Sequence, residues 1–155
     1  MMRGLTRKLR TLLPALLLLV TGACGGDDNN PESEVRAWVA AMQTAAEEKA
    51  RGDLMDGIST AYTDVRGNSR DDINDLLRVY FLRQNNIALL TSIDEVRVIG
   101  ETAAEVELTV GMAGTNDRAL GISADAYRFE LELENDGDDW LLISARWGEL
   151  GDPLR

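Results

Sequence analysis

The sequence predicts an α+β domain in which helices come first and the strands of an antiparallel sheet follow. From residue 31 to about residue 84, apolar side chains recur every three or four residues, which is the period of an amphipathic helix. From Ile87 onward the period falls to two, so that apolar and acidic residues alternate. Consecutive helices followed by consecutive strands favour α+β over the alternating units of a parallel sheet. We therefore expect helices to cover one face of a sheet of about four strands, with its acidic face in water.

The first helix is expected to begin at Asn30-Pro31, where the asparagine caps the helix and the proline takes its first position. Glu32 and Glu34 suit the positive end of the helix dipole. Gly52 is the expected stop. The apolar stripe of this helix consists of Val35, Trp38, Val39, Met42, Ala45 and Ala46.

Two further helices are predicted before the sheet. Asp53 is expected to cap a shorter helix that carries Leu54, Met55, Ile58 and Tyr62. Gly67 then marks a turn. Ser69, with Asp72 three residues later, forms a variant of the capping box and should open a third helix that ends near residues 84–86. Its apolar face consists of Ile73, Leu76, Leu77, Tyr80 and Phe81.

The second half of the chain predicts strands at residues 87–99, 104–112, 127–134 and 140–147. Gly100-Glu101 and the segment from Asn135 to Asp138 are expected turns, and residues 111–121 are predicted to form a loop because they hold several glycines. The last strand is apolar on both parities. That pattern favours a central strand, or one covered on both faces.

The first residues of the chain are typical of a targeting segment. Four basic residues precede a run of about nine apolar ones from Leu12 to Val20, which is too short to span a bilayer, where roughly 20 residues are needed. Small residues then lead to the single cysteine of the chain, in the order Thr21-Gly22-Ala23-Cys24.

These residues resemble the signal peptide and lipobox of a bacterial lipoprotein. The resemblance implies cleavage between Ala23 and Cys24 and attachment of diacylglycerol to Cys24, with palmitate among the acyl chains. The alternative is an ordinary signal peptide cut after Ala23 that leaves a free cysteine. Gly25 stands where an aspartate would favour the inner membrane. The resemblance therefore implies an outer-membrane lipoprotein that faces the periplasm.

The charge of the chain excludes one class of partner. All 27 acidic residues follow Cys24, whereas four of the 16 basic residues precede it. Cleavage before Cys24 would leave 12 basic against 27 acidic residues, a formal charge of −15 compared with −11 for the whole chain. A surface this acidic repels nucleic-acid phosphates, so we expect no nucleic-acid partner.

The composition also limits the available chemistry. The chain has no histidine, and an acylated Cys24 would leave no thiol for a disulfide or for catalysis. The acidic run from Asp136 to Asp139 lacks the spacing of a calcium loop. We expect no metal and no cofactor.

The element order, with a last strand bounded by Trp140 and Trp147, resembles the nuclear transport factor 2-like superfamily, and the stretch from Ile58 to Gln84 is similar to its entry into the third helix. Within it, the chain is most similar to an uncharacterised family of bacterial lipoproteins. The resemblance implies a strongly curved, cone-like sheet over residues 32–150, after a signal peptide at 1–23 and a lipidated tether at 24–31. It also implies a pocket inside the cone. Enzymatic members, such as ketosteroid isomerase and the SnoaL-like polyketide cyclases, place an acid–base pair there.

Asp64 lies nearest in order to the catalytic carboxylate of those enzymes, with Tyr62 two residues before it. A carboxylate in an apolar pocket beside a tyrosine can perform acid–base chemistry. The alternative is that Asp64 pairs with Arg66 or Arg70 in a structured turn. The residues expected to line the pocket, or else to form part of the core, are Trp38, Met42, Tyr62, Tyr80, Arg83, Tyr127, Phe129 and Trp147.

Three functions follow from these expectations. The favoured one is a lipid-anchored, non-catalytic module of the cell envelope that binds a partner or a small apolar ligand. The second is a cofactor-independent isomerase, hydratase or cyclase that uses Asp64 and pocket tyrosines. The third is an envelope assembly protein that dimerises through the outer face of its sheet.

Overall fold

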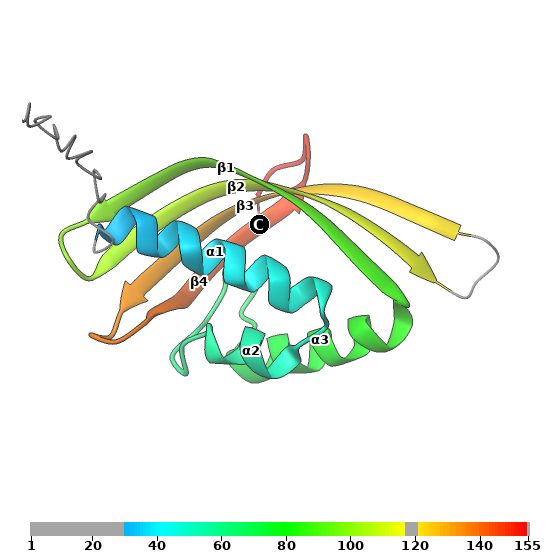
Figure 1. Ribbon diagram of the computed structural model, residues 1–155, viewed down its shortest axis with the longest axis horizontal. Coiled ribbons are helices and arrows are strands. Elements are labelled where there is room, and N and C mark those ends of the chain that lie inside the picture. The colour runs from blue at the N-terminus through cyan, green and yellow to red at the C-terminus, as the bar shows by residue number, and fades with distance from the viewer. Residues whose placement is uncertain (1–29, 117–120, 155) are drawn as a thin grey trace, which may run out of the picture.

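The computed structural model describes residues 30–116 and 121–154, which form three helices and one antiparallel sheet. The sheet has the order β1-β2-β3-β4, and the helices lie against one of its faces (Figure 1). The elements are α1 (Pro31–Glu47), α2 (Arg51–Asp56), α3 (Arg70–Arg83), β1 (Asn86–Ile99), β2 (Ala103–Asn116), β3 (Gly121–Asn135) and β4 (Trp140–Glu149). In this part of the chain no helix has the length and apolar character needed to cross a membrane.

The sheet curves over the helices without closing into a barrel, which confirms the predicted α+β class (Figure 1). Alternate residues of β2 and β3 are buried on the helix side, and Val35 and Val39 of α1 pack against them. The core residues of the two strands are Ala104, Val106, Leu108, Val110, Leu131 and Leu133. The glutamates between them face the opposite, outer side, as the alternation predicts.

Two of the three predicted helix starts are confirmed, whereas the second start and one predicted stop are wrong. The helix α2 begins at Arg51, so Asp53 lies inside it and does not cap it. The Asn30 side chain accepts a hydrogen bond from Glu32 N, and Ser69 and Asp72 form a complete capping box. The first helix ends at Glu47 rather than at Gly52, which lies inside α2. Lys49 makes the turn in the left-handed region, with φ of 55°. Its ammonium donates to the carbonyls of Gln84 and Asn85, and these bonds hold a conformation that normally favours glycine.

The predicted loop over residues 111–121 is also wrong, because β2 continues to Asn116 and β3 begins at Gly121. Gly114 does not mark a turn. A Cβ at this buried position would lie 2.7 Å from Oε1 of Gln84, so a larger residue would displace the end of that side chain.

The last strand is an edge strand, not a central one. Its free edge is covered by the segment that follows α2, which had been expected to be helical as far as Tyr62. Leu142 N donates to Gly57 O, and Ser59 N donates to Leu142 O. Thr63 N donates to the carbonyl of Ile143. Both sets of alternate residues in β4 are apolar because its register shifts at Ile143, so that Trp140 and Leu142 meet the core before the shift and Ala145 and Trp147 meet it afterwards.

Ser69→Ala should lower the free energy of unfolding by about 1 kcal/mol, because it removes the side-chain acceptor at the start of α3. Urea denaturation measures the change. Ser69→Asn keeps an acceptor and should stay within about 0.5 kcal/mol of the parent protein. Equal losses in the two variants would show that the cap does not stabilise α3.

Candidate ligand pocket

An open pocket of about 250 Å³ lies between α1 and the inner face of the sheet. One wall comes from α1 and the other from β1, β2 and β3. The lining residues are Trp38, Val39, Met42, Gln43, Ala46, Leu89, Thr91, Leu108, Val110, Met112, Phe129 and Leu131. Among these described residues none carries a group that titrates, so the pocket offers apolar contact and no acid or base.

Gly57 allows the α1 wall of the pocket to take its position. A Cβ on this buried residue would lie 2.6 Å from Sδ of Met42 and 3.2 Å from Nε1 of Trp38. Trp38 Nε1 is buried against this segment and has no hydrogen-bond partner among the described residues. A side chain at position 57 would therefore push Met42 out of its present place.

The polar groups of α1 next to the pocket are already used. Gln43 Nε2 donates to Leu89 O at 3.2 Å, and Leu89 N donates to Glu47 Oε1 at 2.8 Å. These bonds satisfy the backbone at the outer edge of β1, where unpaired groups would invite another strand. They also leave the pocket with an apolar interior.

The residues expected from the sequence to line one pocket lie in several places. Trp38, Met42 and Phe129 meet in the pocket described above. The Tyr127 ring lies 6.4 Å from that of Phe129, centroid to centroid. The other four are placed elsewhere: Tyr80 and Arg83 line a groove on α3, Tyr62 is buried beside Asp64, and Trp147 stacks under Arg66.

Asp64 is buried, but it forms the centre of a turn and is not among the residues that line the pocket. Its Oδ1 accepts hydrogen bonds from Arg66 N at 2.8 Å and Asn68 N at 2.9 Å. Its Oδ2 accepts one from Asn68 Nδ2 at 2.8 Å. Burial of the carboxylate is therefore compensated by donors from its own turn.

The arginines that were expected to pair with Asp64 bind other groups. Arg70 donates to the carbonyl oxygens of Ile58 and Met55, and so fixes the segment between α2 and α3. The Arg66 guanidinium lies 4.3 Å from the centre of the Trp147 ring and donates to Trp147 O. The turn is thus present as predicted, while its donors are backbone and amide N–H groups.

The three tyrosines are held in their neutral form. Burial, followed by the charge of Asp64 and a hydrogen bond to it, raises the pKa of Tyr62 well above its usual range. Burial, and then the negative charge of Asp125, raises the pKa of Tyr80 and that of Tyr127. A tyrosine with a raised pKa is a hydrogen-bond donor at neutral pH and a poor base.

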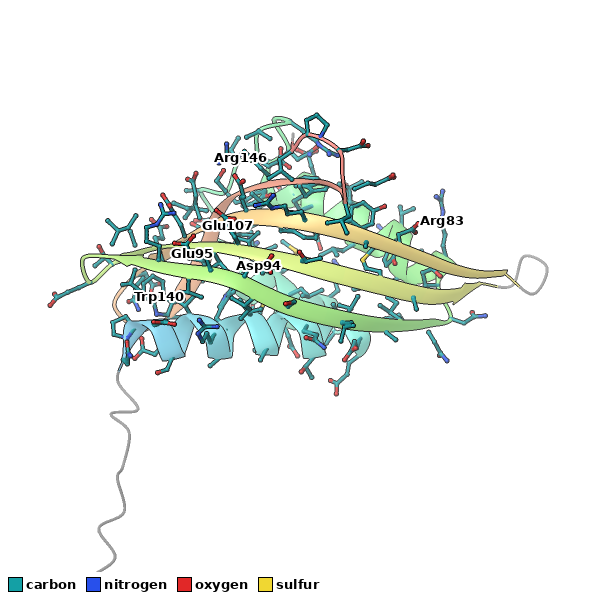
Figure 2. The ribbon with its side chains drawn as sticks, turned by 90° about the horizontal axis from the view of Figure 1, so that it is seen from above. Arg83, Asp94, Glu95, Glu107, Trp140 and Arg146 are labelled. Atoms are coloured by element: carbon teal, nitrogen blue, oxygen red, sulfur yellow. The ribbon has the colours of Figure 1, made fainter. Side chains whose placement is uncertain are left out.

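The outer face of the sheet carries paired charges, visible at Glu95, Glu107 and Arg146 in Figure 2. A shallow hollow of about 260 Å³ lies among them. The ion pairs across this face join Arg97 to Glu95 and Glu105, Arg128 to Glu107, and Arg146 to Glu130. Within the described ranges, no group of three or more acidic, histidine or cysteine side chains is arranged to hold a metal ion.

Nine lining residues were not anticipated as part of a pocket, namely Val39, Gln43, Ala46, Leu89, Thr91, Leu108, Val110, Met112 and Leu131. The three- and four-residue spacing of the helix and the alternation of the strands did predict that most of them face inward. The same pattern describes a filled core, however, and sequence spacing carries no information about where the packing leaves space.

Asp64→Ala should lower the free energy of unfolding by roughly 2 kcal/mol, because it leaves partly buried donors of the turn without an acceptor. Asp75→Ala, on the exposed side of α3, is the matched control and should change it by less than about 0.5 kcal/mol. Chemical denaturation measures both. A stable Asp64→Ala protein would contradict the structural role given to this carboxylate.

Tyr62→Phe should reduce the loss of the free energy of unfolding that the parent protein shows as the pH rises into the alkaline range. Since the folded-state pKa is raised, the neutral hydroxyl contributes its full stability below the unfolded value of about 10, and that stability is lost as the pH rises above it. Denaturation midpoints between neutral and alkaline pH would show a steeper loss in the parent than in the variant. Identical slopes would exclude this effect.

No protein-family model matches the sequence, and no curated protein matches it. Solved structures do match the fold. A ketosteroid isomerase-like protein from Erwinia carotovora atroseptica is 14% identical, with a TM-score of 0.66 over 80% of this chain and 99% of that one. A candidate dehydratase of the NTF2-like family from Streptomyces avermitilis is also 14% identical, with a TM-score of 0.67 over 77% and 96% of the two chains.

A hexachlorocyclohexane dehydrochlorinase of type 2 is 9% identical and gives a TM-score of 0.66, covering 79% of this chain and 87% of that one. At such low identities the likeness concerns the fold alone. The domain therefore has the nuclear transport factor 2-like fold that its element order resembles.

Proposed function

We propose that this domain binds a small apolar molecule in the pocket between α1 and the sheet, and that it does so without catalysis. The observation that carries the proposal is the composition of the pocket, whose described lining residues are apolar or uncharged. Binding sites for small molecules are concave and mostly apolar, with few polar groups. The pocket meets that description.

The volume indicates the size of the ligand. An engineered cavity of about 150 Å³ lined by apolar side chains holds one benzene molecule. A pocket of about 250 Å³ suits a molecule somewhat larger, such as a bicyclic aromatic or a short branched hydrocarbon. Phe129 and Trp38 provide aromatic surfaces for such a molecule.

The enzymatic alternative receives support only at the level of the fold, from neighbours that include the isomerase-like protein and the dehydrochlorinase. A cofactor-independent isomerase, hydratase or cyclase needs an acid or base that reaches its substrate. Asp64 is bound by its own turn, and Tyr62 beside it has a raised pKa. The binding function therefore fits the geometry better.

We further propose that the domain works in the bacterial cell envelope, anchored by acyl chains on Cys24 in the outer membrane and facing the periplasm. The support is the run of targeting features up to Cys24 and the glycine that follows it. Cys24 lies outside the described residues. In cells grown with labelled palmitate, the parent chain should carry the label and the Cys24→Ser variant should not. Label retained on the variant would refute the anchor.

Ala46→Phe should abolish binding of an uncharged bicyclic probe such as 1-aminonaphthalene, because the new ring fills the space beside Met42. The fluorescence of the probe measures binding. Ala40→Phe makes the same change on the exposed side of α1 and should bind as the parent does. Equal affinity in the two variants would place the probe outside this pocket.

Gly57→Ala should lower the affinity for the same probe by roughly tenfold, because the added methyl displaces the end of Met42. The double variant Gly57→Ala/Met42→Ala removes the displaced group and should recover most of the affinity. Thermal melts must show that both proteins are folded. A double variant as weak as the single one would contradict this coupling.

A further inference from the structure

Exposed apolar side chains gather in one part of an otherwise acidic domain. The sequence has no acidic residue between Asp75 and Asp94. Within this stretch, Leu76, Val79 and Leu82 of α3 are 55%, 45% and 80% exposed. We call these three residues, together with Arg78 and Arg83, the α3 patch. Apolar groups in one exposed patch indicate an interaction site more strongly than single ones do.

The patch follows from how α3 packs. Ile73 and Leu77 lie against the core, yet no side chain of this helix is fully buried. Leu76, Val79 and Leu82 are spaced by three, so each is a neighbour of the next, and the row runs along the exposed side of the helix, where Asp72 and Asp75 lie beside its first two residues. The helix is thus apolar on two sides, and only one of them has a partner within the described residues.

The charges of α3 are separated along its length. Asp71, Asp72 and Asp75 lie in its first half, whereas Arg78 and Arg83 lie in its second half. Both arginines are exposed, and neither forms an ion pair with any described residue. Exposed leucines beside unpaired arginines are the combination that phospholipid interfaces accept, since the leucines enter the acyl boundary and the arginines meet the phosphates.

The charges of the sheet are also distributed as lipid contact through the helix layer would require. The outer face of the sheet holds the glutamates, and it lies on the side away from the helices (Figures 1 and 2). Arg83 lies at the opposite end of the domain from Trp140, which binds Glu34 near the start of α1 (Figure 2). The start of α1 and the α3 patch therefore lie at opposite ends of the helix layer.

We propose that the α3 patch lies on the phospholipid surface to which Cys24 anchors the chain, with the helix layer toward the lipid and the acidic sheet face toward the aqueous side. This inference rests on the proposed anchor. Five residues separate Cys24 from Asn30, and the six peptide units between the two Cα atoms reach about 20 Å when fully extended. The helices α1, which is about 25 Å long, and α3 lie on the same face of the sheet (Figure 1), so the chain that leads from Cys24 enters the domain in the layer that contains α3.

The test uses the acylated protein, purified from cells and reconstituted in phosphatidylcholine vesicles. Acylation blocks Cys24, so Leu82→Cys provides a single thiol for an environment-sensitive fluorophore. Its emission should be quenched several-fold more by nitroxide-labelled lipids than that of the control Glu132→Cys, on the exposed outer face. Iodide in the water should quench the two labels in the reverse order.

Each other outcome counts against the proposal. Equal iodide quenching at positions 82 and 132 would show that the patch faces water. A label at position 82 that is shielded from iodide but not quenched by the lipids would show that a second copy or another protein covers the patch. Two reactive thiols per chain in Leu82→Cys would refute the anchor itself, and palmitate labelling reports that failure separately.

Arg78→Glu/Arg83→Glu provides the second variant. It keeps the leucines and replaces only the charges that would meet the phosphates, so the lipid quenching at position 82 should fall by at least half. Unchanged quenching would contradict the role given to the arginines.

Discussion

The strands of this domain are longer than the helix that covers them, and much of the structure follows from that mismatch. Strands of 14 residues extend about 46 Å, whereas the 17 residues of α1 extend about 25 Å. One helix therefore cannot bury the whole apolar face. The pocket opens beside α1 from its middle to its end, where Trp38, Met42 and Ala46 face the strands. The remaining length of the sheet is covered by α3, whose inward residues Ile73 and Leu77 are only partly buried.

The fold also separates the candidate acid–base pair, Asp64 and Tyr62, from the pocket. Asp64 and Tyr62 lie in the segment that covers the edge of β4, and this segment is fixed by backbone hydrogen bonds to Leu142 and Ile143. The pocket lies on the other side of the core, against β1 and β2. A buried carboxylate beside a tyrosine thus stabilises a turn here, and the cavity next to α1 is left without a titrating group.

The sequence was sufficient for the features that depend on local physics. The caps at Asn30 and Ser69, the glycine turn at Gly100 and the alternation of β2 and β3 follow from the residues at each place. It failed where a distant contact decides. Gly52 does not end the first helix, because the turn is made at Lys49, whose ammonium is held by carbonyls that follow α3. Gly114 lies in a strand because β2 pairs there with Ile87 of β1 and Ser123 of β3. For the same reason, spacing identified Trp38, Met42 and Phe129 as inward residues but not the space between them.

The most direct measurement is a crystal structure of the domain soaked with a brominated naphthalene, in which the anomalous signal of bromine locates the ligand. The account predicts one strong peak enclosed by Trp38, Met42 and Phe129, with Asp64 still bound by Arg66 N and Asn68 N. A peak beside Asp64 and Tyr62, with the turn opened, would contradict it and would favour the enzymatic alternative.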